Sequence, residues 1–245
     1  AAAARAHPDG YTLLLTTVAN TINQALRPRP GAHIVENFDH VSLLGYGASV
    51  LIVASDSDIE TLADLRHKAQ AAPGKLIYGS GGIGTSGHLA MELMQLRANI
   101  ALTHVPYKAG SQAVLDLLGG DLDVMFTNLD VALPHIQSGR VRALGVTTRE
   151  RNPQVPELPT IAEQDIAGFE VTTWGGISVP AGTPPERIRV LDEAIRRAVE
   201  GEFRKKQEAV GLLVRPMASE AFGRFVRDET AKWQEVVEQA GVRLD

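Results

Sequence analysis

The stretch Tyr78–His88 is the part of the sequence best suited to chemistry, because five of its eleven residues are glycine (YGSGGIGTSGH). It follows a strand-like run, Lys75–Tyr78, and precedes a helical pattern with Leu89, Leu93 and Leu96 on one face. Glycines permit tight turns and close backbone approach, while free N–H groups at a helix start favour an anion. The pattern predicts a cradle for a carboxylate or phosphate. The alternative is a tight turn that only caps the helix.

A second hypothesis uses the same glycines to bind a dinucleotide. Gly79, Gly81 and Gly84 spell G-x-G-x-x-G between a strand and a helix. That fingerprint needs an acidic residue about 20 positions later for the ribose hydroxyls, and none occurs between Glu92 and Asp116. Lys108 can meet a 2′-phosphate, so an NADP-dependent oxidoreductase stays open as the alternative function.

Several other polar residues are candidates for ligand contact. Ser80, Thr85 and Ser86 add hydroxyl donors to the loop, and His88 fits either a ligand donor or a core histidine. Thr127-Asn128 ends another predicted strand, where open α/β sheets place ligand-binding residues. Trp174 precedes two glycines and fits either a core residue or an aromatic that lines a cleft.

Catalytic and metal signatures are weak in this sequence. It has no G-x-S-x-G, no H-E-x-x-H and no P-loop lysine after the glycines. There is no cysteine, and no two of the seven histidines lie three to five residues apart, which excludes a local zinc motif. We therefore predict neither a catalytic group, nor a metal site, nor a resident cofactor.

Composition excludes several partners and classes. The 245 residues are 44% hydrophobic and 22% charged, which is ordinary globular usage. The formal net charge of −5 and the lack of a basic block argue against nucleic acid. No apolar run approaches the ~18–20 residues that span a bilayer, so direct membrane insertion is not expected.

The order of predicted elements indicates two α/β lobes. Strand-like runs are expected at 11–17, 39–44, 50–54, 75–78, 101–107, 122–126 and 141–147. Helical segments separate those of the middle region, which argues for parallel βαβ units. Thr61 is placed to cap a helix that buries Leu62, Leu65 and Ala69. We predict a first lobe over 1–49, a second lobe over 50–173, and a return to the first lobe with C-terminal helices over 174–245.

Several segments together resemble one family, over nearly the whole chain. They are PDGYTLLL (8–15), ANTIN (19–23), GSGGIGTSGHLA (79–90), THVPYKAGSQAVLDLLGGDLDVMF (103–126), VRALGVTT (141–148), PELPTIAE (156–163), Trp174-Gly175 and PAGTPPE (180–186). Their order is similar to that of the substrate-binding receptors of tripartite tricarboxylate transporters, the Bug-type periplasmic solute-binding proteins.

The resemblance implies a periplasmic-binding-protein type II-like fold, a Venus flytrap of two α/β lobes around a ligand cleft. It implies an extracytoplasmic receptor that binds a small organic acid, usually a carboxylate or dicarboxylate, for membrane transporter subunits. It further implies periplasmic localisation and no catalysis.

The resemblance also assigns ligand contacts. Its glycine loop corresponds to Ser80, Gly82, Gly84 and Thr85, with His88 following, and these residues are the second-lobe candidates. Thr127 stands where many family members have Asp, so the preference for a second ligand group is expected to differ.

One departure from the family concerns the N-terminus. Family members begin with a strand, a loop, a helix and another strand before the helix that leads to PDGY, and no signal peptide is visible here. We therefore expect a first lobe that is truncated at its N-terminus, with Tyr11–Thr17 lacking a neighbouring strand. A structural remnant that no longer binds ligand tightly is a third hypothesis.

Overall fold

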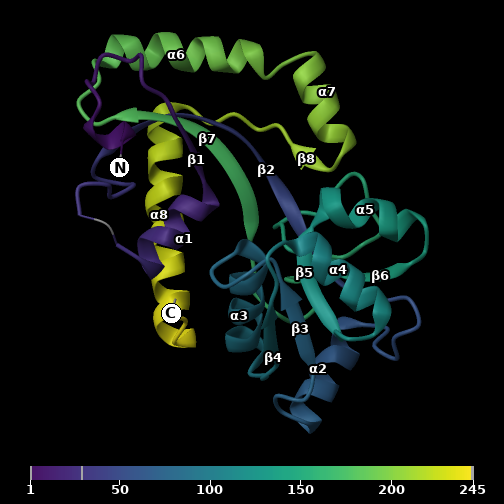
Figure 1. Cartoon of the computed structure of the whole chain (residues 1–245). Coiled ribbons are helices and arrows are strands. Elements are labelled where there is room, and N and C mark those ends of the chain that lie inside the picture. The colour runs from purple at the N-terminus through teal and green to yellow at the C-terminus, as the bar shows by residue number, and fades with distance from the viewer. Residues whose placement is uncertain (1, 29, 244–245) are drawn as a thin grey trace. The chain divides into compact units, whose positions relative to one another are not determined.

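The computed structural model describes residues 2–28 and 30–243, which divide into two compact units (Figure 1). Unit 1 contains residues 2–46 and 173–243, and unit 2 contains residues 47–172. The chain passes from unit 1 into unit 2 within strand β2 (Phe38–Ala54) and leaves it at the start of β7 (Thr172–Pro180). The division predicted from the sequence places these two boundaries after residues 49 and 173.

Unit 2 is built on a mixed sheet with the strand order β6-β2-β5-β3-β4. Its other strands are β3 (Ile77–Ser80), β4 (Thr103–Pro106), β5 (Val124–Asn128) and β6 (Val141–Val146). β3 is parallel to both β4 and β5, whereas the second half of β2 is antiparallel to β5 and β6. The predicted parallel βαβ arrangement of the middle region is confirmed.

Four helices accompany this sheet in the chain, namely α2 (Leu62–Ala71), α3 (Ser86–Ala98), α4 (Gly110–Gly119) and α5 (Leu129–Gln137). Thr61 caps α2 in a reciprocal capping box with Asp64, and Leu62, Leu65 and Ala69 are buried, as the sequence predicts. Apolar side chains of α4 and α5 pack with those of β2 and β5 into one core cluster, which includes Val50, Ile52, Val114, Leu117, Met125 and Leu129.

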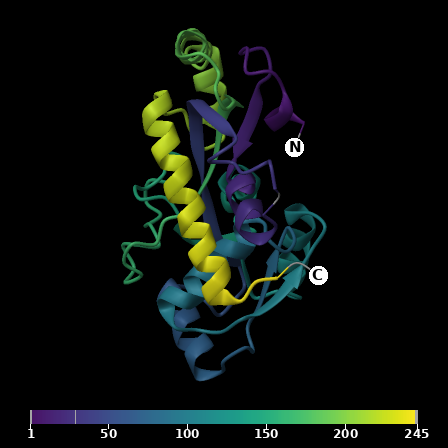
Figure 2. The same cartoon turned by 90° about the vertical axis from the view of Figure 1, so that its left-hand side faces the viewer.

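Unit 1 contains β1 (Leu14–Thr17), α1 (Val18–Leu26), the first half of β2, β7, α6 (Pro185–Ala198), α7 (Glu202–Ala209), β8 (Leu212–Leu213) and α8 (Ser219–Ala240), after a short 3-10 turn at Ala3–Arg5. β1 pairs antiparallel with β7, and β7 and β8 each pair with β2. Helix α8 packs along α1 (Figure 2). It also packs directly on β7, because a Cβ atom at Gly176 would lie 2.3 Å from the Phe222 ring.

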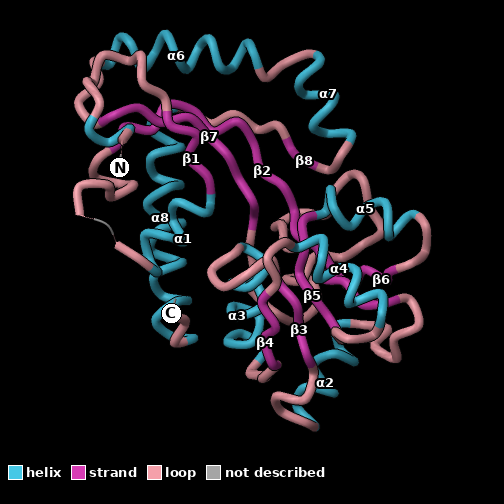
Figure 3. Tube along the Cα trace, in the orientation of Figure 1, coloured by secondary structure: helices cyan, strands magenta, loops and turns pink. Residues whose placement is uncertain are grey.

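The sequence predicts two separate strands at 39–44 and 50–54, and this prediction is wrong. Residues 38–54 form the single strand β2, which runs through Gly45 and Gly47 without a break (Figure 3). Gly45 serves a close contact here, since a Cβ atom on it would lie 2.3 Å from the Leu213 carbonyl oxygen. In a sequence, a glycine that allows a neighbouring backbone to approach closely cannot be told from a glycine in a turn.

Strand β1 is predicted to exchange its amide hydrogens faster than β5. β1 ends the strand order and pairs, among the described residues, only with β7, whereas β5 lies between β2 and β3. Tyr11, Leu13 and Leu15 are 84%, 49% and 59% exposed, so little apolar packing protects this edge. Hydrogen exchange followed by mass spectrometry compares the segments 11–17 and 122–126. Equal, strong protection of both segments in a demonstrated monomer contradicts the prediction.

Candidate anion-binding site

The candidate site lies where three strands of unit 2 end and three helices begin. β3 ends at Ser80 before α3, β4 ends at Pro106 before α4, and β5 ends at Asn128 directly before α5 (Figure 3). Because β3 is parallel to β4 and β5, all three helix N-termini lie at the same edge of the sheet. This edge is where open α/β sheets bind ligands.

Close backbone contacts bring these three junctions together. A Cβ atom at Gly81 would lie 3.2 Å from the Gly110 nitrogen, which joins the glycine loop to the start of α4. A Cβ atom at Gly87 would lie 2.7 Å from the Phe126 carbonyl oxygen, which seats the first turn of α3 on β5. A Cβ atom at Gly110 would lie 4.0 Å from Thr127 Oγ1. The glycines therefore allow the three N-termini to converge.

The electrostatics of this convergence favour a negative charge. None of the N-cap residues Thr85, Ala109 and Asn128 makes a side-chain capping hydrogen bond. The first turns of α3 and α4 contain no acidic residue, and the Asp130 side chain in α5 is exposed. The first N–H groups of a helix have no intrahelical acceptor, and the helix dipole places partial positive charge there. An anion supplies both the acceptor and the opposite charge.

Internal hydrogen bonds fix the loop between β3 and α3. The Gly82 carbonyl accepts from the Thr85 N–H at 3.2 Å, from Thr85 Oγ1 at 2.8 Å and from Ser80 Oγ at 3.2 Å. The Gly82 N–H donates to Ser80 Oγ at 3.1 Å. Gly82 has a φ of 122° and Gly84 a φ of 77°, and the backbone of residues other than glycine rarely adopts these values. The loop is thus held in one conformation by its own polar groups.

Two histidines, the buried His88 and the half-buried His104, lie under this loop. The His88 and His104 rings stack with centroids 4.1 Å apart, and Tyr78 stacks on His104 at 4.7 Å. The Gly84 N–H donates to His88 Nδ1 at 3.1 Å, and Ser80 Oγ lies 2.7 Å from His104 Nε2. Burial, together with the neighbouring His104 in the case of His88, lowers the pKa of each histidine to about 4. Both imidazoles are therefore neutral at pH 7.

The structure gathers Ser80, Gly82, Gly84, Thr85 and His88 in one place, as the sequence predicts, but their polar atoms largely bond one another. Ser80 is fully buried and His88 is 4% exposed. Their bonds to Gly82, Gly84 and His104 give both side chains a role in shaping the loop. Direct ligand contact by these five residues stays a prediction.

Thr127 lies near the start of α4 and Asn128 at the start of α5, whereas Trp174 belongs to unit 1. Thr127 is 7% exposed at the end of β5, and Asn128 is the N-cap of α5. Trp174 is 4% exposed, and its indole N–H donates to Glu229 at 3.1 Å in the core of unit 1. Its only polar atom is therefore engaged inside unit 1, and the candidate site is built without it.

Sequence reasoning missed the third junction, the start of α4 at Ala109–Gly110. A weak signal exists there, because Gly110 follows a short strand and opens a helix, as the glycines of the main loop do. One small residue in KAGS draws less attention than five glycines. Its place beside Gly81 depends on the pairing of β3 with β4, which the sequence does not display.

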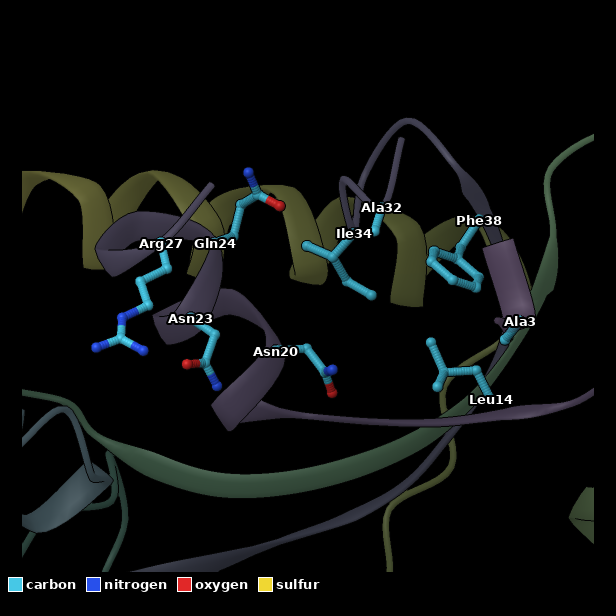
Figure 4. A pocket seen from close by; sticks show the side chains of 9 residues that line it. All are labelled: Ala3, Leu14, Asn20, Asn23, Gln24, Arg27, Ala32, Ile34 and Phe38. Carbon is cyan, nitrogen blue, oxygen red and sulfur yellow. The ribbon is translucent and has the colours of Figure 1, made fainter. Parts of the chain in front are cut away.

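Unit 1 contains a separate pocket of about 230 Å³ between α1 and the segment 32–38. Figure 4 shows Leu14, Ile34 and Phe38 toward one end and Asn23 and Arg27 toward the other. The polar atoms of α1 are partly engaged, since Asn20 Oδ1 accepts the Thr17 N–H at 2.8 Å and Asn23 Nδ2 donates to the Ala19 carbonyl at 2.7 Å. This pocket belongs to unit 1, whereas the three converging helix N-termini belong to unit 2.

Residues 2–28 and 30–243 contain no cluster of three or more His, Asp or Glu side chains that could hold a metal ion. In the same part of the chain, no helix combines the length and the hydrophobicity required to span a bilayer.

Comparison with known proteins identifies the family. The model of the family described as "Tripartite tricarboxylate transporter family receptor" matches residues 1–242. The chain therefore belongs to this family, as its motifs predict. It is 37% identical over 236 residues to the UPF0065 protein in the tcbD-tcbE intergenic region of Pseudomonas sp. strain P51, covering 96% of this chain and 70% of that protein. Protein BugT of Bordetella pertussis is 31% identical, covering 99% of this chain and 76% of BugT.

Solved structures share the fold. R. palustris Rpa4515 with adipate aligns with a TM-score of 0.82 at 29% identity, covering 99% of this chain and 82% of that one. MatC (Rpa3494) from Rhodopseudomonas palustris with bound malate aligns with a TM-score of 0.79 at 27% identity, covering 96% and 82%. The fold is that of the periplasmic solute-binding proteins, and the family consists of receptors and not of enzymes.

The lowered pKa values of three histidines predict that the protein loses stability in mild acid. His40, His88 and His104 have folded-state pKa values lowered to about 4, chiefly by burial, against 6.5 in the unfolded chain. Between pH 6.5 and 4 the unfolded chain binds more protons than the folded one. The free energy of unfolding therefore has its highest contribution from these histidines above pH 6.5 and decreases as the pH falls below 6.5. Urea unfolding at pH 7, 6, 5 and 4.5 measures this slope.

A pair of variants isolates the histidine contribution. His88→Asn should reduce the slope, while the same change at the exposed His7 should not. Burial raises the pKa of Glu92, so its protonation makes the free energy of unfolding rise, not fall, as the pH decreases. Because Glu92 is present in both variants, its contribution does not distinguish them. A free energy of unfolding that stays constant from pH 7 to 4.5 contradicts the prediction.

Proposed function

We propose that this chain is an extracytoplasmic receptor that binds a small organic acid through a carboxylate at the candidate anion-binding site. The observation that carries the proposal is the convergence of three helix N-termini without side-chain caps, from α3, α4 and α5. Each leaves N–H donors and partial positive charge at one edge of the sheet. A carboxylate matches these donors in charge and in size.

The relatives support an organic acid as the ligand. One similar structure holds adipate and another holds malate, and both molecules are dicarboxylates. Thr127 places a neutral hydroxyl, and not a charge, beside the start of α4. We propose C4–C6 dicarboxylates as the substrate class, without a preference between short and long members.

The family suggests the biological setting of this binding. We propose that the receptor acts in the periplasm and delivers its ligand to the membrane subunits of a tripartite tricarboxylate-type transporter. No nucleic acid partner or direct membrane insertion is part of the proposal.

Binding of NADP is the alternative that an experiment can exclude. The fingerprint Gly79, Gly81 and Gly84 is present, but Gly79 is used for packing, since a Cβ atom there would lie 2.4 Å from Leu122 Cδ1. The Gly84 N–H donates to His88 and not to open space. Isothermal titration calorimetry and thermal unfolding with malate, adipate and NADP separate the two hypotheses.

The expected outcome is stabilisation by one of the two acids and none by NADP. An acid held at 100 times its Kd should raise the free energy of unfolding by about 2.7 kcal/mol. Stabilisation by NADP and by neither acid would overturn the proposed function.

Gly82→Ala is predicted to weaken acid binding far more than its effect on folding explains. Gly82 has a φ of 122°, and a Cβ atom there would lie 3.2 Å from the Tyr107 carbonyl oxygen, so the loop must shift. Gly120→Ala is the matched control, because Gly120 has a φ of 84° and open space around it at the far end of α4. Both variants should lose about 1 kcal/mol of stability from backbone strain.

Only Gly82→Ala is expected to weaken binding, by about tenfold. Calorimetry with the acid that binds the unaltered protein measures the affinity, and urea unfolding measures the stability. Equal affinities for the two variants would place the ligand away from this loop.

A further inference from the structure

The His88 side chain lies under the glycine loop and accepts a hydrogen bond from it. It is 4% exposed, and its ring stacks nearly parallel on that of His104 at 4.1 Å, while Tyr78 also stacks on His104 at 4.7 Å. Its Nδ1 atom accepts the Gly84 N–H at 3.1 Å across the turn that opens α3. This hydrogen bond links Gly84 of the loop to His88 of helix α3, which is four residues further along the chain.

This hydrogen bond fixes the tautomer of the neutral His88 ring. An atom that accepts an N–H carries no proton of its own, so the neutral ring holds its proton on Nε2. Nε2 lies 3.7 Å from Glu92 Oε1, which also accepts hydrogen bonds from the Tyr78 hydroxyl and from Gln95. A second proton on the ring must go to Nδ1, where it faces the Gly84 N–H and removes the acceptor.

We propose that His88 is a positioning residue that locks the anion-binding loop through the Gly84 N–H, and that protonation of His88 releases this lock. The proposal rests on the proposed function only for its effect on ligand binding. With the lock closed, the Gly84 N–H is directed inward and the loop holds the shape that converges on the starts of α4 and α5. With the lock open, two donors face each other and the loop loses that shape.

Within residues 2–28 and 30–243, the titratable groups that face His88 are His104, Glu92 and Tyr78. The stacked His104 on β4 opposes a positive charge, whereas Glu92 on α3 attracts one, and the Tyr78 hydroxyl on β3 donates to the same Glu92. Burial and, to a smaller extent, the neighbouring His104 lower the pKa of His88 to about 4. The lock is therefore closed at neutral pH and opens in acid.

Two substitutions separate the acceptor from the ring. His88→Asn places Oδ1 near the position of Nδ1 and keeps a non-titrating acceptor, whereas His88→Phe keeps the stacked ring and removes the acceptor. The first measurement is made without ligand, on the full chain. Amide NMR follows the Gly84 chemical shift with pH, and hydrogen exchange at pH 7 follows its protection.

In the unaltered protein the Gly84 shift should titrate near pH 4, and in His88→Asn it should not. Exchange of the Gly84 amide should be about tenfold faster in His88→Phe than in His88→Asn, because only the former lacks an acceptor. Urea unfolding confirms that both variants are folded. The same Gly84 exchange rate in both folded variants, or a Gly84 shift in the unaltered protein that does not titrate, overturns the lock.

Binding is the second measurement, with malate and adipate as probes at pH 7. His88→Phe should bind about fivefold more weakly than His88→Asn, in proportion to one lost hydrogen bond. If Gly84 behaves as expected and neither acid binds even the unaltered protein, the lock stands and the proposed function fails. If the acids bind both variants equally although Gly84 is released only in His88→Phe, its role in positioning the loop for ligand is wrong.

Discussion

The parallel pairing of β3 with β4 and with β5 is the constraint from which the candidate site follows. Parallel neighbours need crossover connections, and here each of these strands is followed by a helix that starts at the strand's carboxyl end. Three helix starts are therefore brought to one edge by topology alone. Their first N–H groups and dipoles add at that edge, and the lack of side-chain caps leaves the donors to a ligand.

The loop between β3 and α3 divides its polar atoms between holding its own shape and meeting a ligand. Ser80, Thr85 and His88 bond to Gly82 and Gly84, which satisfies groups that would otherwise be costly to bury. The N–H groups of the first turn of α3 receive no such side-chain partner. A loop that is fixed before the ligand arrives loses little conformational entropy on binding.

The sequence predicts this candidate site because its main signal is local. Five glycines at a strand-to-helix junction, the Thr61 cap and the strand–helix alternation all depend on neighbours in the chain. The inward roles of Ser80 and His88 depend on His104, which the register of β3 with β4 brings beneath the loop. The continuity of β2 and the contact of Trp174 with Glu229 also require partners distant in sequence. Such pairings leave no periodic trace in a single sequence.

The glycines of this loop meet two different structural requirements. For this reason the sequence alone fits both an anion site and a dinucleotide site. Gly82 and Gly84 are needed for their positive φ angles, whereas Gly79, Gly81 and Gly87 admit neighbouring atoms that a Cβ atom would displace. A dinucleotide fingerprint uses glycines for the same two reasons. What separates the hypotheses is therefore the chemistry around the loop. A dinucleotide site adds an acidic residue for the ribose, which is missing between Glu92 and Asp116, while this edge adds the starts of α4 and α5 without side-chain caps, which supply further donors to an anion.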